Sequence, residues 1–419
     1  MKSIWKFSLR WLHLAARLVW SAGNWVVAPL RPAPGWSGLK RWLRQIITIV
    51  TLFALSGLLV VTMGLIPIKA SSGHWQITAW FLNFTMGRSV ATHALAVTAP
   101  SLDNAGMVRK GALHYDAGCF PCHGNPAIRH PRIAQQMTPH PPYLPPVIHE
   151  WKPEELFYIV KHGVKFTGMP AWPAQQRDDE VWAIVAFLEK FPELDEQAYR
   201  RLVTGATTDA KTSLASLPGG EGSPLQSLAG TQSTGQSISA NCGRCHGSDG
   251  QGLETGIAPK LAGQRQAYLE ASLEAYARGD RPSGIMEPIA VGMSPAQVRE
   301  AARHYSSKIA DASEEQPPPT SETAISRGAK IAHEGVPKTR VPICVQCHRD
   351  SDDSRNLNYP ILAGQYATYI EQQLQLFSDD RRGGSEFASL MHQVASRLTA
   401  EQMRDVALYY ESLAGQPPR

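Results

Sequence analysis

All six cysteines of this 419-residue chain fall in three copies of one five-residue pattern, and no other feature limits the fold as strongly. The pattern is Cys-x-x-Cys-His, and its copies occupy residues 119–123, 242–246 and 344–348. Six cysteines are too few for a disulfide-dense scaffold of this length, and none lies outside the pattern. The sequence therefore contains three sites built on one plan.

The spacing of the pattern is that of a covalent haem attachment site. Two thiols separated by two residues can add to the two vinyl groups of one haem, and the next residue presents an imidazole to the iron. Zinc sites and redox dithiols also use Cys-x-x-Cys, but a zinc site needs further Cys or His at partner spacing, and none appears. We therefore predict three covalently bound haem c groups in an oxidising, extracytoplasmic compartment. The predicted haem-linked cysteines are Cys119, Cys122, Cys242, Cys245, Cys344 and Cys347. The predicted proximal iron ligands are His123, His246 and His348.

Further residues recur in the same order around each motif. A Pro-x-Leu follows each motif, then a methionine 27, 27 or 31 residues later, then apolar residues at i, i+3, i+4 and i+7, as in a helix with one buried face. The prolines are Pro142, Pro259 and Pro360, and the methionines are Met169, Met286 and Met391. The apolar stripes begin at Val181, Val298 and Met403, the last two after the capping boxes Ser294-x-x-Gln297 and Thr399-x-x-Gln402. A short segment precedes each motif, around Gly111, Gly235 and Gly328.

This order resembles that of class I cytochrome c domains, over roughly residues 105–195, 230–310 and 323–415. The resemblance implies that each motif histidine donates a hydrogen bond to the carbonyl of the following proline (Pro142, Pro259 or Pro360), which fixes the ring. It also implies that Met169, Met286 and Met391 are the sixth iron ligands. The second and third copies are the most alike, since residues 261–264 and 362–365 both read Leu-Ala-Gly-Gln, as expected of a diheme cytochrome c made of two class I domains.

Other side chains compete for the sixth-ligand position. Met137 lies near the first site and Met293 near the second, and His162 and His392 are the histidines nearest the predicted methionines. Thioether ligation raises the reduction potential relative to two histidines, and six-coordinate iron has no open position for oxygen or peroxide. We therefore predict haems that pass electrons, and no catalytic residue. In the first copy the proline lies 19 positions after His123, which leaves a haem peroxidase or gas sensor as the alternative from another class.

An apolar run near the N-terminus predicts a membrane anchor. Residues 46–68 carry no charge, and 23 helical residues at ~1.5 Å each are long enough for a hydrocarbon core of ~30 Å. Lys40, Arg41 and Arg44 precede the run and only Lys69 follows closely, which by the positive-inside rule keeps the N-terminus cytoplasmic. The run is long, begins 45 residues into the chain and lacks a small-x-small cleavage site, so we predict an uncleaved single-pass anchor in a bacterial inner membrane.

Charge is distributed unevenly along the chain. Residues 1–102 contain ten Lys or Arg and no Asp or Glu, whereas the remainder contains 31 basic and 36 acidic residues. A basic head on a mildly acidic body suits a membrane surface better than nucleic acid, and no nucleic-acid partner is predicted. The basic residues of 2–17 recur at helical spacing, which favours either a helix on the inner leaflet or a plain positive-inside leader. The aromatic stretch 74–90 either rests in the membrane interface or docks a partner subunit.

The predicted fold class is all-α, with one N-terminal transmembrane helix followed by three class I cytochrome c domains. The predicted order is a basic leader 1–45, a transmembrane helix 46–68, a membrane-proximal segment 69–104, domain one 105–202, a flexible linker 203–229, domain two 230–310, a linker 311–322 and domain three 323–419. We call the three haem-motif segments repeat one (105–202), repeat two (230–310) and repeat three (323–419).

The resemblance implies a periplasmic electron-transfer subunit fixed to the inner membrane. It would relay single electrons from a periplasmic dehydrogenase to the respiratory chain, and the three-haem cytochrome subunits of membrane-bound alcohol, aldehyde and gluconate dehydrogenases are similar in architecture. The alternative within the same class is the cytochrome subunit of a terminal oxidase complex.

Overall fold

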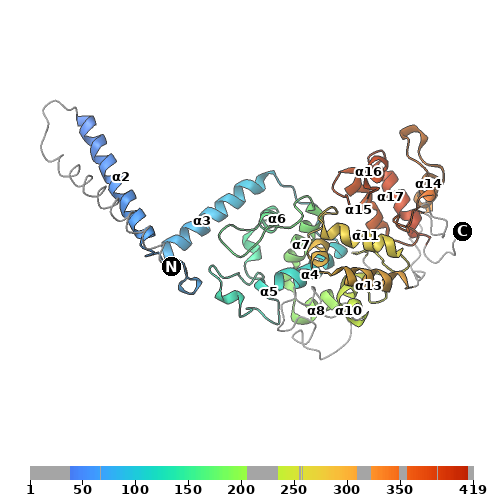
Figure 1. The fold of residues 1–419 in the computed structure, drawn as a ribbon, viewed down its shortest axis with the longest axis horizontal. Helices are drawn as coiled ribbons and strands as arrows, with labels where there is room; N and C mark the ends of the chain where they lie inside the picture. Colours follow the sequence, from blue (N-terminus) through green and yellow to red (C-terminus); the bar gives the residue numbers. More distant parts are fainter. Residues whose placement is uncertain are drawn as a thin grey trace, which may run out of the picture. The chain divides into compact units, whose positions relative to one another are not determined.

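The computed structural model describes residues 38–66, 68–204, 235–253, 256, 258–308, 322–348, 356–384 and 386–413. The first 37 residues of the predicted leader, and nearly all of the two predicted linkers, lie outside these ranges. The described residues form helices and no β-strand, which confirms the helical fold class (Figure 1). They belong to two compact bodies, residues 1–72 and 73–419.

The first body contains α2 (Gly38–Thr62) and a short 3-10 turn, Ala70–Ser72. Within the part of the chain that the structure describes, α2 is the one helix long and apolar enough to cross a membrane. Its residues Trp42–Thr62 have a mean hydropathy of 2.2, and none of that stretch is buried. The helix overlaps the predicted span 46–68 but starts earlier and ends at Thr62. It ends there because Gly64 adopts a left-handed φ of 68°, and the Leu65 N–H returns to the Val60 carbonyl at 3.1 Å in a Schellman-type cap.

The second body begins with α3 (Gln76–His93) and a 3-10 turn, Ala94–Ala96. The C-terminal end of α3 packs on repeat one, where the His93 ring stacks on Tyr158 at a centroid distance of 5.4 Å. Several large side chains of the predicted aromatic stretch are exposed: Trp75, Ile77, Trp80, Phe81 and Phe84. Their exposure is compatible with both predicted roles of this stretch.

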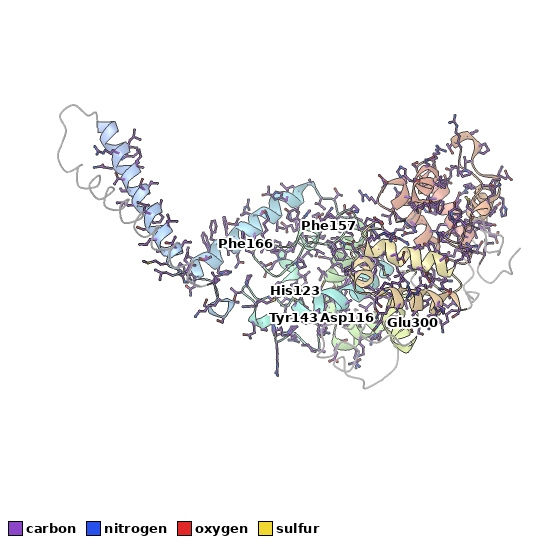
Figure 2. All side chains as sticks on the ribbon, in the orientation of Figure 1. Asp116, His123, Tyr143, Phe157, Phe166 and Glu300 are labelled. Carbon is purple, nitrogen blue, oxygen red and sulfur yellow. The ribbon has the colours of Figure 1, made fainter. Side chains whose placement is uncertain are left out.

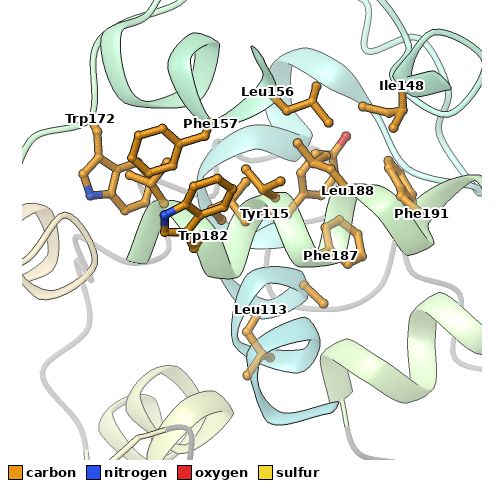
Figure 3. Close-up of a cluster of buried hydrophobic side chains, with 14 of the residues drawn as sticks. Leu113, Tyr115, Ile148, Leu156, Phe157, Trp172, Trp182, Phe187, Leu188 and Phe191 are labelled. Atoms are coloured by element: carbon orange, nitrogen blue, oxygen red, sulfur yellow. The ribbon is translucent and has the colours of Figure 1, made fainter. Parts of the chain in front are cut away.

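Repeat one is a bundle of helices around an aromatic core. Its helices are α4 (Ala105–His114), a π-helical turn (Tyr115–Cys119), α5 (Phe120–His123), α6 (Pro153–His162), α7 (Asp178–Lys190) and α8 (Glu196–Thr204), with 3-10 turns at Ala134–Gln136, Ile148–Glu150 and Phe191–Glu193. Helix α4 crosses α7 so closely that a Cβ on Gly111 would overlap the Ala183 carbonyl. Figure 3 shows the core beside this crossing, where Tyr115 and Phe187 lie together and Phe157 stacks on Trp182 at 4.3 Å.

Repeats two and three have the same order of helices. Repeat two contains α10 (Gly235–His246), α11 (Gln266–Ala277), α12 (Met286–Val291) and α13 (Pro295–Ser306). Repeat three contains α14 (Glu322–Glu334), 3-10 turns at Pro337–Thr339 and Cys344–Gln346, α15 (Ala367–Ser378), α16 (Ala388–Ala395) and α17 (Ala400–Glu411). Gly328 of α14 lies against the Asp405 carbonyl of α17, as Gly111 lies against α7 in repeat one. In repeats one and three, a glycine therefore lets two helix backbones come into contact.

The predicted helix with an apolar stripe is confirmed in each repeat. The three apolar stripes are buried on α7, α13 and α17. Both predicted capping boxes are formed: the Ser294 hydroxyl accepts from the Gln297 N–H at 3.3 Å, and the Thr399 hydroxyl accepts from the Gln402 N–H at 3.2 Å. Local sequence thus sets where these helices begin and which face they bury.

Candidate cofactor sites

Each motif histidine is held by the carbonyl of the proline that follows it. The Nδ1-to-oxygen distances are 2.9 Å for His123 and Pro142, 2.9 Å for His246 and Pro259, and 3.0 Å for His348 and Pro360 (Figure 2 labels His123). When Nδ1 donates to a carbonyl, the lone pair of the neutral imidazole is on Nε2. Burial lowers the pKa of all three imidazoles, although the hydrogen bond to proline opposes this. Each ring is therefore neutral and oriented, as a metal ligand must be.

The chain reverses direction directly after the first two motifs. Gly124 and Gly247 follow the histidines with φ values of 73° and 76°, a left-handed conformation that glycine adopts without a steric penalty. In repeat one the Tyr115 hydroxyl donates to the Gly124 carbonyl at 2.7 Å and holds the turn against α4. Repeat three has Arg349 at the matching position, which lies outside the described residues.

The six cysteines are free thiols that are partly exposed. Burial, reinforced by the second cysteine of each motif, raises the pKa of Cys119 to about 12 and that of Cys242 to about 11. Burial also raises the pKa of Cys344 to about 11. Among the described residues, no group of three or more His, Cys, Asp or Glu is arranged to hold a metal ion. Each motif thus offers a pair of thiols and one imidazole.

One cavity of about 1950 Å³ is lined by all three motifs, by the three prolines and by Met169, Met286 and Met391. Its wall is largely apolar. The cavity, the thiol pairs and the free Nε2 atoms fit a large, flat, mainly apolar group that binds iron and forms two thioether bonds. The residues present therefore fit haem c.

The three predicted methionine ligands come from different local structures. Met169 lies in the loop after α6, where its N–H donates to the Thr167 hydroxyl at 3.1 Å. Met286 is the first residue of α12, and Met391 lies inside α16. Of the competing residues, Met293 and His162 also line the cavity, whereas His392 makes a hydrogen bond through Nδ1 to the Phe377 carbonyl at 2.8 Å. The identity of the sixth ligands stays a prediction.

Repeats two and three meet through a reciprocal pair of glutamines. The Gln264 side-chain amide donates to the Ile361 carbonyl at 2.6 Å and accepts from the Ile361 N–H at 3.1 Å. The Gln365 side chain makes the same two contacts with the backbone of Lys260, at 3.0 and 2.9 Å. These glutamines end the two Leu-Ala-Gly-Gln segments, whose repetition the sequence shows but whose role it does not.

Sequence reasoning missed an arginine pair at the same interface. Arg281 donates to the Tyr369 hydroxyl at 3.0 Å, and Arg382 donates to the Tyr268 hydroxyl at 3.4 Å, so each contact crosses between the repeats. The two arginines line the cavity, and Nε of Arg382 is buried without a hydrogen-bond partner. Buried cations require anions nearby, which the propionates of haem would provide. Arg382 lies 101 positions after Arg281, and Tyr369 lies 101 positions after Tyr268. An alignment of the two repeats could therefore have identified both pairs.

Sequence reasoning also missed the polar contacts between repeats one and two. The Arg177 guanidinium donates to the Pro282 carbonyl at 2.9 Å and lies 3.0 Å from the Glu180 carboxylate. Asp116 of repeat one forms an ion pair with Arg244, a residue inside the second haem motif (Asp116 is labelled in Figure 2). Arg177 and Asp116 each have a partner in repeat two that lies more than a hundred positions along the chain, and no local pattern marks them.

Comparisons with known proteins match two parts of the chain to family models. The model described as cytochrome c oxidase, cbb3-type, subunit III matches residues 106–188, and the model described as cytochrome c matches residues 232–320. The thiosulfate dehydrogenase electron acceptor of Thiomonas intermedia is 36% identical over 178 residues, which are 42% of this chain and 79% of that protein. Cytochrome c4 of Pseudomonas aeruginosa is 30% identical over 191 residues, 45% of this chain and 92% of that protein. The solved structure of Acidithiobacillus ferrooxidans cytochrome c4 is 34% identical, with a TM-score of 0.37, over 42% of this chain and 99% of that chain.

Proposed function

We propose that this chain, which belongs to the cytochrome c family, is a membrane-anchored three-haem relay that passes single electrons from a periplasmic dehydrogenase to the respiratory chain. The observation that carries the proposal is the same arrangement at all three motifs. In each, a thiol pair, an imidazole oriented by a proline carbonyl and a methionine line the cavity. Three such sites in one chain favour electron transfer over the binding of a single cofactor.

The residues of each site have distinct roles in this proposal. The two cysteines would form the thioether bonds, and Nε2 of the histidine and the sulfur of the methionine would bind the iron. Bound haem supplies a one-electron couple between ferric and ferrous iron. The proline carbonyl holds the imidazole, and the apolar wall would exclude water from a bound haem and favour its less charged ferrous form. The chain contributes position and potential, and no bond of a substrate is made or broken.

The relatives support a dehydrogenase as the electron donor. One of them is named as the electron acceptor of thiosulfate dehydrogenase, and its matched stretch of 178 residues is about as long as repeats two and three together. Another is a cytochrome c4. We therefore propose that the paired repeats two and three accept or deliver electrons at one end of the relay.

A terminal oxidase complex is the second candidate on the acceptor side. The match of residues 106–188 to the model for a subunit of cbb3-type cytochrome c oxidase favours it, since this match covers most of repeat one. Mild detergent extraction followed by identification of the bound proteins distinguishes the two. A dehydrogenase subunit supports the first candidate, and haem–copper subunits support the second.

We propose that α2 anchors the chain in the bacterial inner membrane with the repeats in the periplasm. The apolar stretch Trp42–Thr62 and the basic residues that precede it support this orientation. A reporter fused after residue 104 that is active only in the periplasm is expected to be active, and the mature protein is expected to retain its leader. Release of the chain from membranes by alkaline carbonate would contradict the anchor.

Haem content tests the relay itself. The mass of the denatured chain is expected to exceed that of the polypeptide by three haem groups, and a smaller number of haems would contradict the proposal. A spectrum of the reduced protein with and without carbon monoxide tests the alternative. Stoichiometric carbon monoxide binding would indicate an open iron position, as in a haem peroxidase or gas sensor, and would exclude a pure relay.

A further inference from the structure

One buried carboxylate contacts the methionine loops of two repeats. Glu180 lies in the first turn of α7, in repeat one, and its side chain is 2% exposed. Its Oε1 accepts a hydrogen bond from the Ser283 hydroxyl at 2.7 Å, and its Oε2 accepts one from the Gly284 backbone N–H at 2.7 Å. Oε2 also lies 3.3 Å from the indole N–H of Trp172, which donates to it. Trp172 belongs to the loop of repeat one and Ser283 to that of repeat two, so Glu180 ties the two loops together.

The Ser283 hydroxyl carries this contact on to a predicted iron ligand. Its oxygen accepts hydrogen bonds from the backbone N–H groups of Ile285, at 3.3 Å, and Met286, at 3.1 Å. Because the hydroxyl proton is donated to Glu180, the oxygen is free to accept both bonds. The backbone at Met286 is thus held by Ser283, and the orientation of Ser283 is held by a residue of repeat one.

The groups around Glu180 leave little freedom at this contact. The Arg177 guanidinium lies 3.0 Å from Oε1 and donates to the Pro282 carbonyl at 2.9 Å, so the loop is also held one residue earlier. The Trp172 indole occupies the space that a Cβ on Gly284 would need. Hydrogen bonds to a buried charged group are among the strongest that side chains make. The loop of repeat two is therefore fixed from outside its own repeat.

Repeat three provides an internal comparison. When Met286 and Met391 are aligned, Ala388 stands in the place of Ser283. The matching loop of repeat three therefore has no hydroxyl at this position. Whatever holds Met391, it is not this arrangement.

We propose that Glu180 of repeat one is a positioning residue for Met286 of repeat two, so that docking of repeat one sets the ligation and the reduction potential of the second haem. This rests on the proposed function, because it takes Met286 as the sixth ligand of that haem. Thioether ligation favours ferrous iron, so a less firmly held Met286 lowers the potential of the second haem alone.

Ser283→Ala in the full-length holoprotein tests the proposal without a change of charge. Covalent haem is counted first by mass, since a count other than three would be a failure of the proposed function. In the ferric protein, we expect the thioether-to-iron charge-transfer band to lose about one third of its intensity, one methionine of three. In a redox titration we expect the midpoint potential of one haem to fall. At a fixed solution potential, its ratio of reduced to oxidised form should be at least tenfold lower, which corresponds to ~59 mV. Ser283→Thr, which keeps the hydroxyl, is expected to restore both.

Glu180→Gln and a matched control separate positioning from general destabilisation. The amide retains the size of Glu180 but has one acceptor oxygen, so the charge-transfer band is expected to weaken as in Ser283→Ala. Asp405→Asn is the control, because Asp405 is a buried carboxylate of repeat three, bonded to Arg327 at 2.6 and 2.7 Å. It is expected to lower the melting temperature and to leave the band and all three potentials unchanged. The proposal is overturned if Ser283→Ala and Glu180→Gln leave the band and potentials unchanged, or if Asp405→Asn changes them equally.

Discussion

The contact between repeats one and two and the contact between repeats two and three use different chemistry. Repeats two and three meet through Gln264 and Gln365, each of which exchanges two hydrogen bonds with the backbone of the other repeat. The guanidinium groups of Arg281 and Arg382 also donate to tyrosine hydroxyls across this interface. Repeat one meets repeat two through charged groups, among them Arg177 and Glu180. Reciprocal, neutral contacts arise when both halves of a duplicated pair carry the same residue at the same position. The docking of repeat one depends instead on residues that occur once.

This difference predicts which contacts respond to salt and to pH. Neutral hydrogen bonds to backbone are expected to be insensitive to salt and to pH, whereas ion pairs change with both. The glutamine contacts of repeats two and three should therefore persist at salt concentrations and acid pH values that weaken the ion pairs of repeat one. The following experiments are designed to separate the two interfaces.

Arg177→Ala is expected to have the largest effect. The substitution leaves the buried carboxylate of Glu180 without its cation, and breaking a buried ion pair from one side costs ~3–5 kcal/mol. We expect repeat one to separate from repeat two while repeats two and three stay paired. Small-angle X-ray scattering measures the separation, and calorimetry measures the fall in the first unfolding transition. Arg404→Ala, at an exposed ion pair with Glu371, is the control and is expected to change neither. An Arg177→Ala protein with unchanged scattering would contradict this account of the docking.

Gln264→Ala and Gln365→Ala are expected to have intermediate and equal effects. Each removes two hydrogen bonds and leaves two backbone groups of the other repeat without partners, at a cost of ~1–3 kcal/mol. Both should weaken the pairing of repeats two and three, with no change in the contact of repeat one. Hydrogen exchange at the Ile361 and Lys260 amides measures each contact directly. Clearly unequal effects would show that the interface is not reciprocal in energy.

The docking of repeat one is expected to weaken only below about pH 4. Burial alone would raise the pKa of Asp179, but hydrogen bonds and charge from Arg177 outweigh it and hold the pKa below its ordinary value. The ionised carboxylate therefore contributes stability above about pH 4, its value in an unfolded chain, and this is lost as the pH falls through the lower folded pKa. Asp179 also accepts from Gln372 of repeat three at 2.6 Å. The contribution of Asp179 to the midpoint temperature of the first unfolding transition should be constant from pH 5 to 7 and should fall at lower pH. Asp179→Asn should remove this acid dependence.

Asp116→Asn is expected to have the smallest effect. Its ion pair with Arg244 is partly exposed, and such pairs contribute about 0.5–1 kcal/mol and are screened by salt. The Tyr199 hydroxyl, which donates to Asp116 at 2.9 Å, can still donate to the amide oxygen. We expect the variant to lose part of the salt dependence of the first unfolding transition. If the variant keeps the salt dependence of the natural protein, the Asp116–Arg244 ion pair does not cause it.

Local patterns predicted much of the helical framework. The capping boxes at Ser294 and Thr399 and the buried stripes of the last helices follow from residues within one helix, so no distant contact is needed to find them. The run of apolar residues predicted α2, but hydropathy excluded the charged residues of its first turns, and Gly64 ends the helix before the apolar run does. Glycine at a left-handed position is a stop signal that the predicted span ignored.

Contacts between repeats could not be predicted in the same way. Glu180 is one acidic residue in a helical first turn, where a solvent-exposed carboxylate is the ordinary expectation. Its burial depends on Ser283 and Gly284, more than a hundred residues along the chain. Gln264 and Gln365 were visible as a repeated motif, but the direction of their side chains depends on how the two repeats meet. Each Cys-x-x-Cys-His motif is local in the sequence, whereas the contacts that join the repeats are not.

Near-infrared magnetic circular dichroism of the ferric full-length protein tests the central claim most directly, because it reports the ligands of each haem. The account predicts three low-spin haems for each chain, all with the histidine–methionine signature, and no high-spin iron. A bis-histidine signature at any haem, or a high-spin signal from one, would contradict the ligand set on which the relay depends.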